Sequence, residues 1–274
     1  MAARIAYLAI LSHNPDKLAQ FYKDYLGFSE LGRSAGGDFT VTDGGFNVTI
    51  FRHRHELNEL SMEPGQHHIG IAVDSIAEVE KRYRKFNPRG TFRREAGDLQ
   101  HGEARIYDPE CHPVSLSERN FGLPVPINFL PRIAHIAFGA LDPGALFHFW
   151  SEVFGFRELL AAHAEAAKRP GYRNRHVGDG ATNIALQEFF NDREGHEGRH
   201  GIAHIGLLVK DATALAESVK DVATIAQRPA TRKQSEIRMR DPEGNACDLS
   251  RRGWEVDIDR WIGSDSAQVS QVDS

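Results

Sequence analysis

The chain has 274 residues, and its 33 Lys and Arg against 38 Asp and Glu give a formal net charge of -5. Charges of both signs are interspersed, which is not typical of proteins that bind nucleic acids or anionic membranes. A hydrophobic content of 41% and a charged content of 26% are those of an ordinary globular protein. No apolar run is long enough to span a bilayer, and the length predicts about two domains.

The cysteines and the N-terminus indicate a compartment. Cys111 and Cys247 are the two cysteines, too few for a disulfide framework. The apolar run over residues 5–11 is short and leads directly into a helix cap, so it is not typical of a signal peptide. We therefore expect a protein of the reducing cytoplasm.

One short apolar phrase, followed by a residue that can cap a helix, occurs four times. The clearest copy covers residues 201–209 and is followed by Asp211. Such a run predicts a strand, and the following Asp or Asn predicts a helix start. One phrase used four times predicts one structural unit used four times. The other copies cover residues 5–10, 68–73 and 132–138, with Asn14, Asp74 and Asp142 as the capping residues.

The first unit begins with a strand over residues 4–11 and a helix over 15–25, which Gly27 ends. Three short strands follow, the last over 47–51, so the predicted order is β-α-β-β-β. The second unit repeats this order. Its helix runs from Ser75 to about Phe86, and strands follow near Phe92, at 104–107 and at 113–117, with the turn Asp108-Pro109-Glu110-Cys111 before the last strand.

The third unit repeats the first: Phe21-Tyr22 and Leu26-Gly27-Phe28 return as Phe149-Trp150 and Phe154-Gly155-Phe156. A turn over 177–180 precedes a strand over 182–189. The fourth unit has a helix from Asp211 to about Val222 and strands over 237–240 and 245–250, joined by the turn Asp241-Pro242-Glu243-Gly244. The residues beyond Trp261 are rich in Ser, Asp and Gln, and we expect disorder there.

These elements predict an α+β protein with four βαβββ modules paired into two domains, each a cup-shaped mixed sheet with helices outside. We place the first domain at 1–118, a linker at 119–131, the second domain at 132–252 and a tail at 253–274. The linker contains Gly122, Pro124 and Pro126, which favour an irregular backbone.

Four such units, a helix that ends in Leu-Gly-Phe or Phe-Gly-Phe, and an Asp-Pro-Glu turn resemble the vicinal oxygen chelate superfamily, over about residues 4–251. That group includes glyoxalase I, the fosfomycin and bleomycin resistance proteins and the extradiol dioxygenases. Two paired units in each of two domains are most similar to the type I extradiol dioxygenases. In these, the resemblance implies, the first domain has no metal and the second holds Fe(II).

The resemblance places metal ligands at His135, His204 and Asp248. Strand alternation supports the last, because Cys247 and Leu249 then face the helix and Asp248 faces the cavity. Two imidazoles and one carboxylate suit non-haem Fe(II) with open positions for a chelating substrate and O2. Aspartate stands where the family usually has glutamate, so Mn, Zn, Ni or Co remain alternatives.

The corresponding positions in the first domain are Tyr7, His68 and Ser115, of which one is a good ligand. We therefore expect the first domain to bind no metal. A single His on a strand is more often a hydrogen-bonded structural residue, and we interpret His68 in this way.

Other candidate residues follow from strand parity or from the resemblance. The family's acid-base His falls here near Thr182 or Asn183, and its Tyr falls at Arg238, which suits an anionic substrate group but could equally be a solvated strand residue. Candidates for the catalytic role are His176, His200 and Arg238, although His176 and His200 could also be plain surface residues. Candidates for substrate binding are Tyr172, Asn183 and Gln187.

Three functions remain open. The first is an Fe(II)-dependent, extradiol-type dioxygenase of aromatic catabolism, which cleaves a catechol-like or other vicinal-oxygen substrate with O2. The second is a non-redox metal isomerase, lyase or hydrolase of the glyoxalase type, in which the metal acts as a Lewis acid. The third is a metal-free protein that binds small molecules. By analogy with the superfamily we also expect a homo-oligomer, without nucleic-acid or membrane partners.

Overall fold

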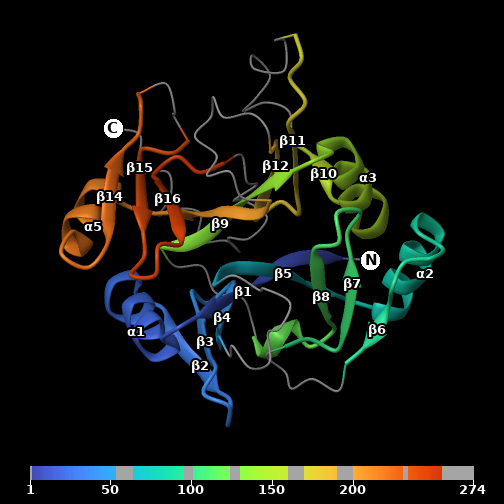
Figure 1. Cartoon of the computed structure of the whole chain (residues 1–274), viewed down its shortest axis with the longest axis horizontal. Coiled ribbons are helices and arrows are strands. Elements are labelled where there is room, and N and C mark those ends of the chain that lie inside the picture. Colours follow the sequence, from blue (N-terminus) through green and yellow to red (C-terminus); the bar gives the residue numbers. More distant parts are fainter. Residues whose placement is uncertain are drawn as a thin grey trace, which may run out of the picture.

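The computed structural model describes residues 2–53, 64–95, 101–123, 130–159, 170–189, 200–230 and 234–254. It consists of two halves, each built on one eight-stranded mixed sheet (Figure 1). No helix in these ranges is long and apolar enough to cross a membrane. The first half contains helices α1 (Pro15–Leu26) and α2 (Ile76–Phe86), the short 3-10 helix η2 (Asn120–Gly122) and strands β1 (Ala3–Ser12), β2 (Ser29–Arg33), β3 (Phe39–Thr42), β4 (Asn47–Arg52), β5 (Gly65–Val73), β6 (Arg93–Arg94), β7 (Ala104–Tyr107) and β8 (Pro113–Ser117).

The second half repeats this arrangement. Its helices and strands are α3 (Pro143–Phe154), α5 (Ala212–Val219), β9 (Arg132–Ala140), β10 (Arg157–Glu158), β11 (Arg175–Gly178), β12 (Asn183–Glu188), β13 (Gly201–Leu208), β14 (Thr224–Gln227), β15 (Ile237–Arg240) and β16 (Ala246–Ser250).

The strand order is the same in both sheets and confirms the predicted α+β fold. It is β2-β3-β4-β1-β5-β8-β7-β6 in the first and β10-β11-β12-β9-β13-β16-β15-β14 in the second. The opening strands of two units pair antiparallel at the centre, β1 with β5 and β9 with β13. Each opening strand also pairs parallel with the last strand of its own unit. Polar groups on the first and last strands of a unit therefore meet at the centre of the sheet.

Three of the four predicted helix caps are confirmed. The side chains of Asn14, Asp142 and Asp211 accept hydrogen bonds from backbone amides of the first turns of α1, α3 and α5. The prediction for Asp74 was wrong, because Ser75 caps α2 and a carboxylate oxygen of Asp74 instead accepts from the backbone amide of residue 2 at 2.7 Å. Helix α5 ends at Val219, a little before the predicted end near Val222, and a turn then leads into β14.

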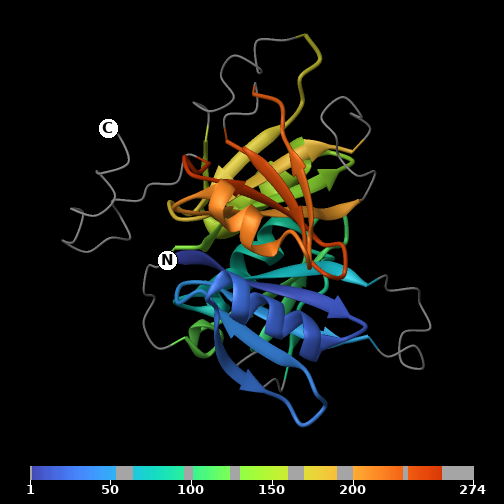
Figure 2. The ribbon, with the colours of Figure 1, turned by 90° about the vertical axis from the view of Figure 1, so that its left-hand side faces the viewer.

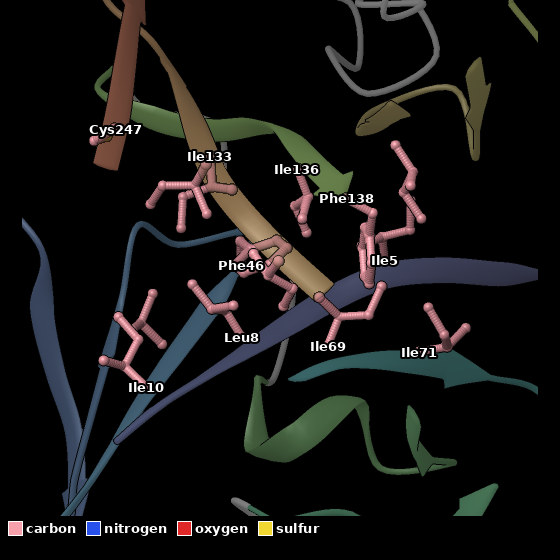
Figure 3. Packing of buried hydrophobic residues seen from close by; sticks show 14 of the residues in the cluster. Ile5, Leu8, Ile10, Phe46, Ile69, Ile71, Ile133, Ile136, Phe138 and Cys247 are labelled. Atoms are coloured by element: carbon pink, nitrogen blue, oxygen red, sulfur yellow. The ribbon is translucent and has the colours of Figure 1, made fainter. Parts of the chain in front are cut away.

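The halves pack against each other through one face of each sheet (Figure 2). Helix α1 lies near α5, and α2 lies near α3, so each helix contacts a helix of the other half. In the close view, Leu8 and Ile69 of the first half face Ile133 and Ile136 of the second (Figure 3), and all four belong to one buried cluster. We call the opposite face of each sheet, which points away from this shared core, its outer face.

Two aspartates bind the backbone of the opposite half in the same way. Asp43 Oδ2 accepts from the amide of Ile133 at 2.7 Å, and Asp179 Oδ2 accepts from the amide of Ile5 at 2.6 Å. The other oxygen of each carboxylate accepts two amides of its own turn. Burial raises the pKa of both carboxyls, whereas the backbone hydrogen bonds and one nearby arginine for each lower it. The starts of β1 and β9 are thus each fixed by a buried carboxylate of the other half.

The glutamates of the two Asp-Pro-Glu turns form a second reciprocal pair. Glu110 accepts from the amides of Leu141 and Asp142, at 3.0 and 2.7 Å. Glu243 accepts from the amide of Asn14 at 2.9 Å and from the hydroxyl of a neighbouring serine at 2.8 Å. Each glutamate therefore reaches the point in the other half where a central strand ends and a helix begins.

Asp241 gives the fold a specific pH dependence. Its Oδ2 accepts from the side chain of Asn245 at 2.8 Å and lies 3.5 Å from the hydroxyl of Tyr22 of the other half. Burial raises the pKa of Asp241 to about 6, against the opposing hydrogen bonds. Because the folded pKa lies above the unfolded value, this group favours folding below about pH 4, and that contribution is lost as the pH rises through 6.

Asp241→Asn is expected to remove this effect. Between pH 4 and pH 7 the free energy of unfolding of the wild type should fall by about 2 kcal/mol relative to the variant. Urea unfolding at a series of pH values measures the difference. Asp211→Asn, which also removes one carboxylate but at an exposed helix cap, is the control. Parallel curves for the wild type and Asp241→Asn would contradict the prediction.

Candidate metal centre

The three predicted metal ligands lie on neighbouring strands of the second sheet. His135 is on β9, His204 on β13 and Asp248 on β16, and their exposed fractions are 3%, 5% and 3%. In the register of the sheet, Gly206 on β13 pairs with His135 on one side and with Asp248 on the other. A Cβ at Gly206 would lie 2.5 Å from the ring of Trp254 and 2.8 Å from the Cβ of His135, so glycine leaves room for both side chains. We call His135, His204 and Asp248 the triad.

The side chains of the triad are neighbours, and one of them contacts Asn183. Nε2 of His204 lies 3.5 Å from Oδ2 of Asp248, and the ring centroids of His135 and His204 are 5.5 Å apart. Nδ1 of His135 lies 2.8 Å from Oδ1 of Asn183. When Nδ1 carries the proton and donates it there, Nε2 keeps its lone pair, which is the usual arrangement for a metal-binding histidine. The chemistry of these donors suits a divalent metal, but the potential ligand atoms of the three side chains do not all lie within 4.8 Å of one another, so a bound ion would have to draw them closer.

Arg238 is the main departure from a simple metal site. Its Nε and Nη2 donate to the two oxygens of Asp248 at 2.6 and 3.0 Å, and its exposed fraction is 7%. Burial raises the pKa of Asp248, but the charge of His204 and the hydrogen bonds from Arg238 outweigh it and hold the pKa well below its usual range. A cation already neutralises the carboxylate, so a metal has to share Asp248 with the guanidinium or displace it.

Trp254 is a site residue that the sequence analysis missed. Its ring stacks on that of His135 at 4.9 Å, with an angle of 6° between the planes. In the first half, Phe121 stacks on Tyr7 at 4.7 Å, so each half carries an aromatic ring at the equivalent position. Both rings lie four residues after the end of the last strand of their half, in segments we interpreted as linker and tail. This repeated spacing is a signal that could have revealed them.

The equivalent positions in the first half have a different chemistry. His68 is buried, and its Nε2 lies 3.1 Å from the hydroxyl of Ser115. The ring of Tyr7 lies 5.7 Å from that of His68. Burial, and the nearby charge of His67, lower the pKa of His68 well below its usual value, so the imidazole is neutral at pH 7.

The candidate substrate-binding residues lie at different places. Asn183 is beside the triad, where it binds His135. Gln187 lies further along β12 on the same face; it is 8% exposed, and its Oε1 has no hydrogen-bond partner among the described residues. Tyr172 is half-buried in the segment that precedes β11.

The two candidate catalytic histidines lie in different parts of the structure. His176 on β11 is buried and pairs in register with Ala185, the residue between Asn183 and Gln187 on their face of β12. His200 precedes β13, and its Nε2 lies 2.7 Å from Oε2 of Glu110 in the first half. The structure therefore places His176 on the outer face that carries the triad, and it places His200 at the junction of the halves.

Comparison with known proteins agrees with the duplicated fold. The family model of the glyoxalase/bleomycin resistance protein/dioxygenase superfamily matches residues 4–116 and 132–249. The chain belongs to this superfamily. The two matched segments correspond to the two sheets, so each half is a superfamily unit pair. No curated protein sequence gives a significant match.

Solved structures of the superfamily share the whole architecture. The Mn(II)-bound glyoxalase from Novosphingobium aromaticivorans has a TM-score of 0.67 at 17% identity, covering 94% of this chain and 85% of that one. The 2,3-dioxygenase LapB from Pseudomonas sp. KL28 has a TM-score of 0.65 at 17% identity, covering 90% and 91%. Homoprotocatechuate 2,3-dioxygenase from Arthrobacter globiformis has a TM-score of 0.62 at 16% identity, covering 90% and 78%. At these identities the likeness establishes the fold.

Proposed function

We propose that the chain is a metal-dependent enzyme whose second half binds the metal through His135, His204 and Asp248. The observation that carries the proposal is the placement of two imidazoles and a carboxylate on one face of three neighbouring strands. The hydrogen bond from His135 to Asn183 supports it, because it leaves Nε2 of His135 to a metal. The substrate is a small molecule with two neighbouring oxygen donors, and the reaction we favour is extradiol-type ring cleavage with Fe(II) and O2.

The side chains around the triad have separate tasks in this proposal. Bound Fe(II) supplies the redox chemistry between a vicinal diol and O2. Asn183 fixes the orientation of His135, and Trp254 covers one side of its ring and excludes water. His176, buried on the same face, is positioned to accept or return the substrate proton. The amide oxygen of Gln187 is available to accept a hydrogen bond from the substrate.

A non-redox reaction of the glyoxalase type is the second candidate. Arg238 and Asn183 occupy positions where we expected the Tyr and the acid-base His of ring-cleaving relatives, and both bind ligands of the triad. Because Arg238 and Asn183 are bound to the triad, they are not available as acid-base groups. A reaction in which a divalent ion polarises a substrate oxygen as a Lewis acid depends less on such groups than ring cleavage does. The Mn(II)-bound glyoxalase among the similar structures is in keeping with this reading.

Metal analysis and oxygen uptake separate the candidates. The full chain is loaded anaerobically with Fe(II) or Mn(II), and oxygen consumption is measured with a panel of catechols. Uptake that requires Fe(II) and yields a yellow ring-fission product supports the dioxygenase. Bound metal without oxygen uptake, together with metal-dependent turnover of hemithioacetals, supports the glyoxalase-type reaction. Failure of the triad to retain either metal rejects both and leaves a metal-free binding protein.

Arg238→Gln tests whether Asp248 is available to a metal. Removing the guanidinium leaves His204 as the remaining charged neighbour of the buried Asp248, which should lower the free energy of unfolding of the metal-free protein by about 3 kcal/mol. A divalent ion at the triad replaces the lost cation, so metal should raise the Tm of the variant more than that of the wild type.

Arg240→Gln on the same strand, whose guanidinium bonds the carbonyl of Gly244, is the control and should show neither effect. An Arg238→Gln protein that metal fails to stabilise would show that Asp248 does not serve as a ligand.

A further inference from the structure

We infer that Glu110, His112 and His200 form a second metal site, which takes Zn²⁺ or a similar first-row divalent ion. Among the described residues this is the one group of three side chains whose potential ligand atoms all lie within 4.8 Å of one another. Glu110 and His112 belong to the first half, and His200 belongs to the second. The site is therefore separate from the triad and joins the two halves.

The geometry of the three side chains suits one ion. Nε2 of His200 lies 2.7 Å from Oε2 of Glu110, and the ring centroids of His112 and His200 are 4.5 Å apart. Each carboxylate oxygen has two lone pairs, so Glu110 has acceptor capacity beyond the two backbone amides that it binds at residues 141 and 142. An ion between the side chains takes the place of the His200–Glu110 hydrogen bond.

His112 is held as a metal ligand usually is. Its Nδ1 lies 2.8 Å from Oδ2 of Asp108, and its side chain is 14% exposed. Its Nε2 is buried and has no hydrogen-bond partner among the described residues. A carboxylate on one ring nitrogen and a free lone pair on the other is the common arrangement around a metal-binding histidine. A Cβ at Gly201 would lie 3.3 Å from this Nε2, so glycine keeps the space in front of it open.

The internal repeat of the chain shows that the fold does not require the two histidines. In the second half, Glu243 accepts the backbone amide of the helix-capping residue Asn14, as Glu110 accepts that of Asp142. Asn245 stands in place of His112, and its amide donates to Asp241 at 2.8 Å, as His112 binds Asp108. Pro64 precedes Gly65 where His200 precedes Gly201. The cross-half hydrogen bonds of the glutamate are therefore structural in both halves of the repeat. The two histidines are present at only one of the two equivalent places.

The chemistry of the donors selects the ion. Two imidazoles and one carboxylate are a donor set that Zn²⁺ takes in proteins, with a fourth position for water. Ni²⁺, Co²⁺ and Cu²⁺ also accept imidazole, whereas Mg²⁺ and Ca²⁺ prefer oxygen ligands. The side chain of His200 is 37% exposed, so the ion is reached from solvent. Because the ligands come from both halves, the ion binds the folded arrangement and stabilises it.

The test uses the full chain, without a tag and stripped of metal, and compares His204→Ala with His204→Ala/His112→Asn. His204→Ala removes a triad ligand, so the result does not depend on the proposed function. Calorimetric titration with Zn²⁺ should show one ion bound to the single variant and none to the double variant. Zn²⁺ should raise the Tm of the single variant alone, and Mg²⁺ should raise neither. Because the other half already carries Asn at the equivalent position, His112→Asn should fold.

His200→Gln in the same background is the independent check and should also abolish Zn²⁺ binding. A Tm of each metal-free variant equal to that of the His204→Ala parent shows that the fold is retained. Equal Zn²⁺ binding with and without His112 overturns the proposal, and so does the absence of Zn²⁺ binding by the single variant.

Discussion

His204→Ala should lose the metal of the triad while the second site keeps its own. His204 lies on the central strand between the other two ligands and is 3.5 Å from Oδ2 of Asp248. Its removal leaves one imidazole and a carboxylate already paired with Arg238. Two ligands hold an ion far more weakly than three, and we expect a loss in Fe(II) affinity of at least about 100-fold, since even changes to groups that only hydrogen-bond a ligand cost 10–100-fold.

The measurement is the number of metal ions per chain after anaerobic loading and desalting, together with the rate of metal-dependent turnover. His68→Ala is the matched control, because His68 has the equivalent place in the first half and is equally buried. It should retain the metal. Full metal content in His204→Ala protein that also carries His112→Asn would reject the triad, and an equal loss in His68→Ala would show that the effect is a general disturbance of the fold.

Asp179→Ala should cause a large loss of stability at the junction of the halves. It removes the acceptor of three backbone amides, those of Ile5, Ala181 and Thr182. Hydrogen bonds to a charged group contribute about 1.5–3 kcal/mol each, and a buried amide without a partner has a further cost. We expect the free energy of unfolding to fall by about 3–5 kcal/mol.

Denaturant unfolding of the metal-free protein measures this loss. Asp38→Ala is the control, since Asp38 also accepts a backbone amide, that of Arg52, but within one half and near the surface. Its loss should stay near 1 kcal/mol. The double variant Asp43→Ala/Asp179→Ala should lose more than the sum of the single variants, because the half-buried Arg4 and the buried Arg132 then lack both nearby carboxylates. A loss for Asp179→Ala no larger than that for Asp38→Ala would contradict the role of the cross-half contact.

Much of the fold was readable from local patterns. The caps at Asn14, Asp142 and Asp211, and the αL glycines that end two helices, depend on neighbours a few residues away. Strand alternation correctly placed Cys247 and Leu249 in the shared core, with Asp248 on the other face. The prediction that Asp74 caps α2 failed because two adjacent residues could cap the same helix. The side chain of Asp74 instead accepts a hydrogen bond from the backbone amide of residue 2, which is distant in sequence.

The site was readable only in part. The triad positions follow from the resemblance and from the period of two along a strand. The pairing of Arg238 with Asp248 needs the antiparallel register of β15 and β16, in which these two residues are partners. The stacking of Trp254 on His135 and the approach of His200 to Glu110 depend on how separate segments return to the sheet. The residue periods of helices and strands do not predict such contacts between distant segments.

By itself, then, the sequence determined that one structural unit occurs four times, where its helices start and on which face of a strand each residue lies. These features depend on interactions over a few residues. The tertiary structure decided which polar atoms meet. At the junction, buried carboxylates accept hydrogen bonds from the backbone of the opposite half. In the second half Asp248 pairs with Arg238, and His200 lies in a cluster with His112 and Glu110. The physical reason is that leaving a buried polar atom without a partner costs free energy, and the packing of distant segments sets which partner is within reach.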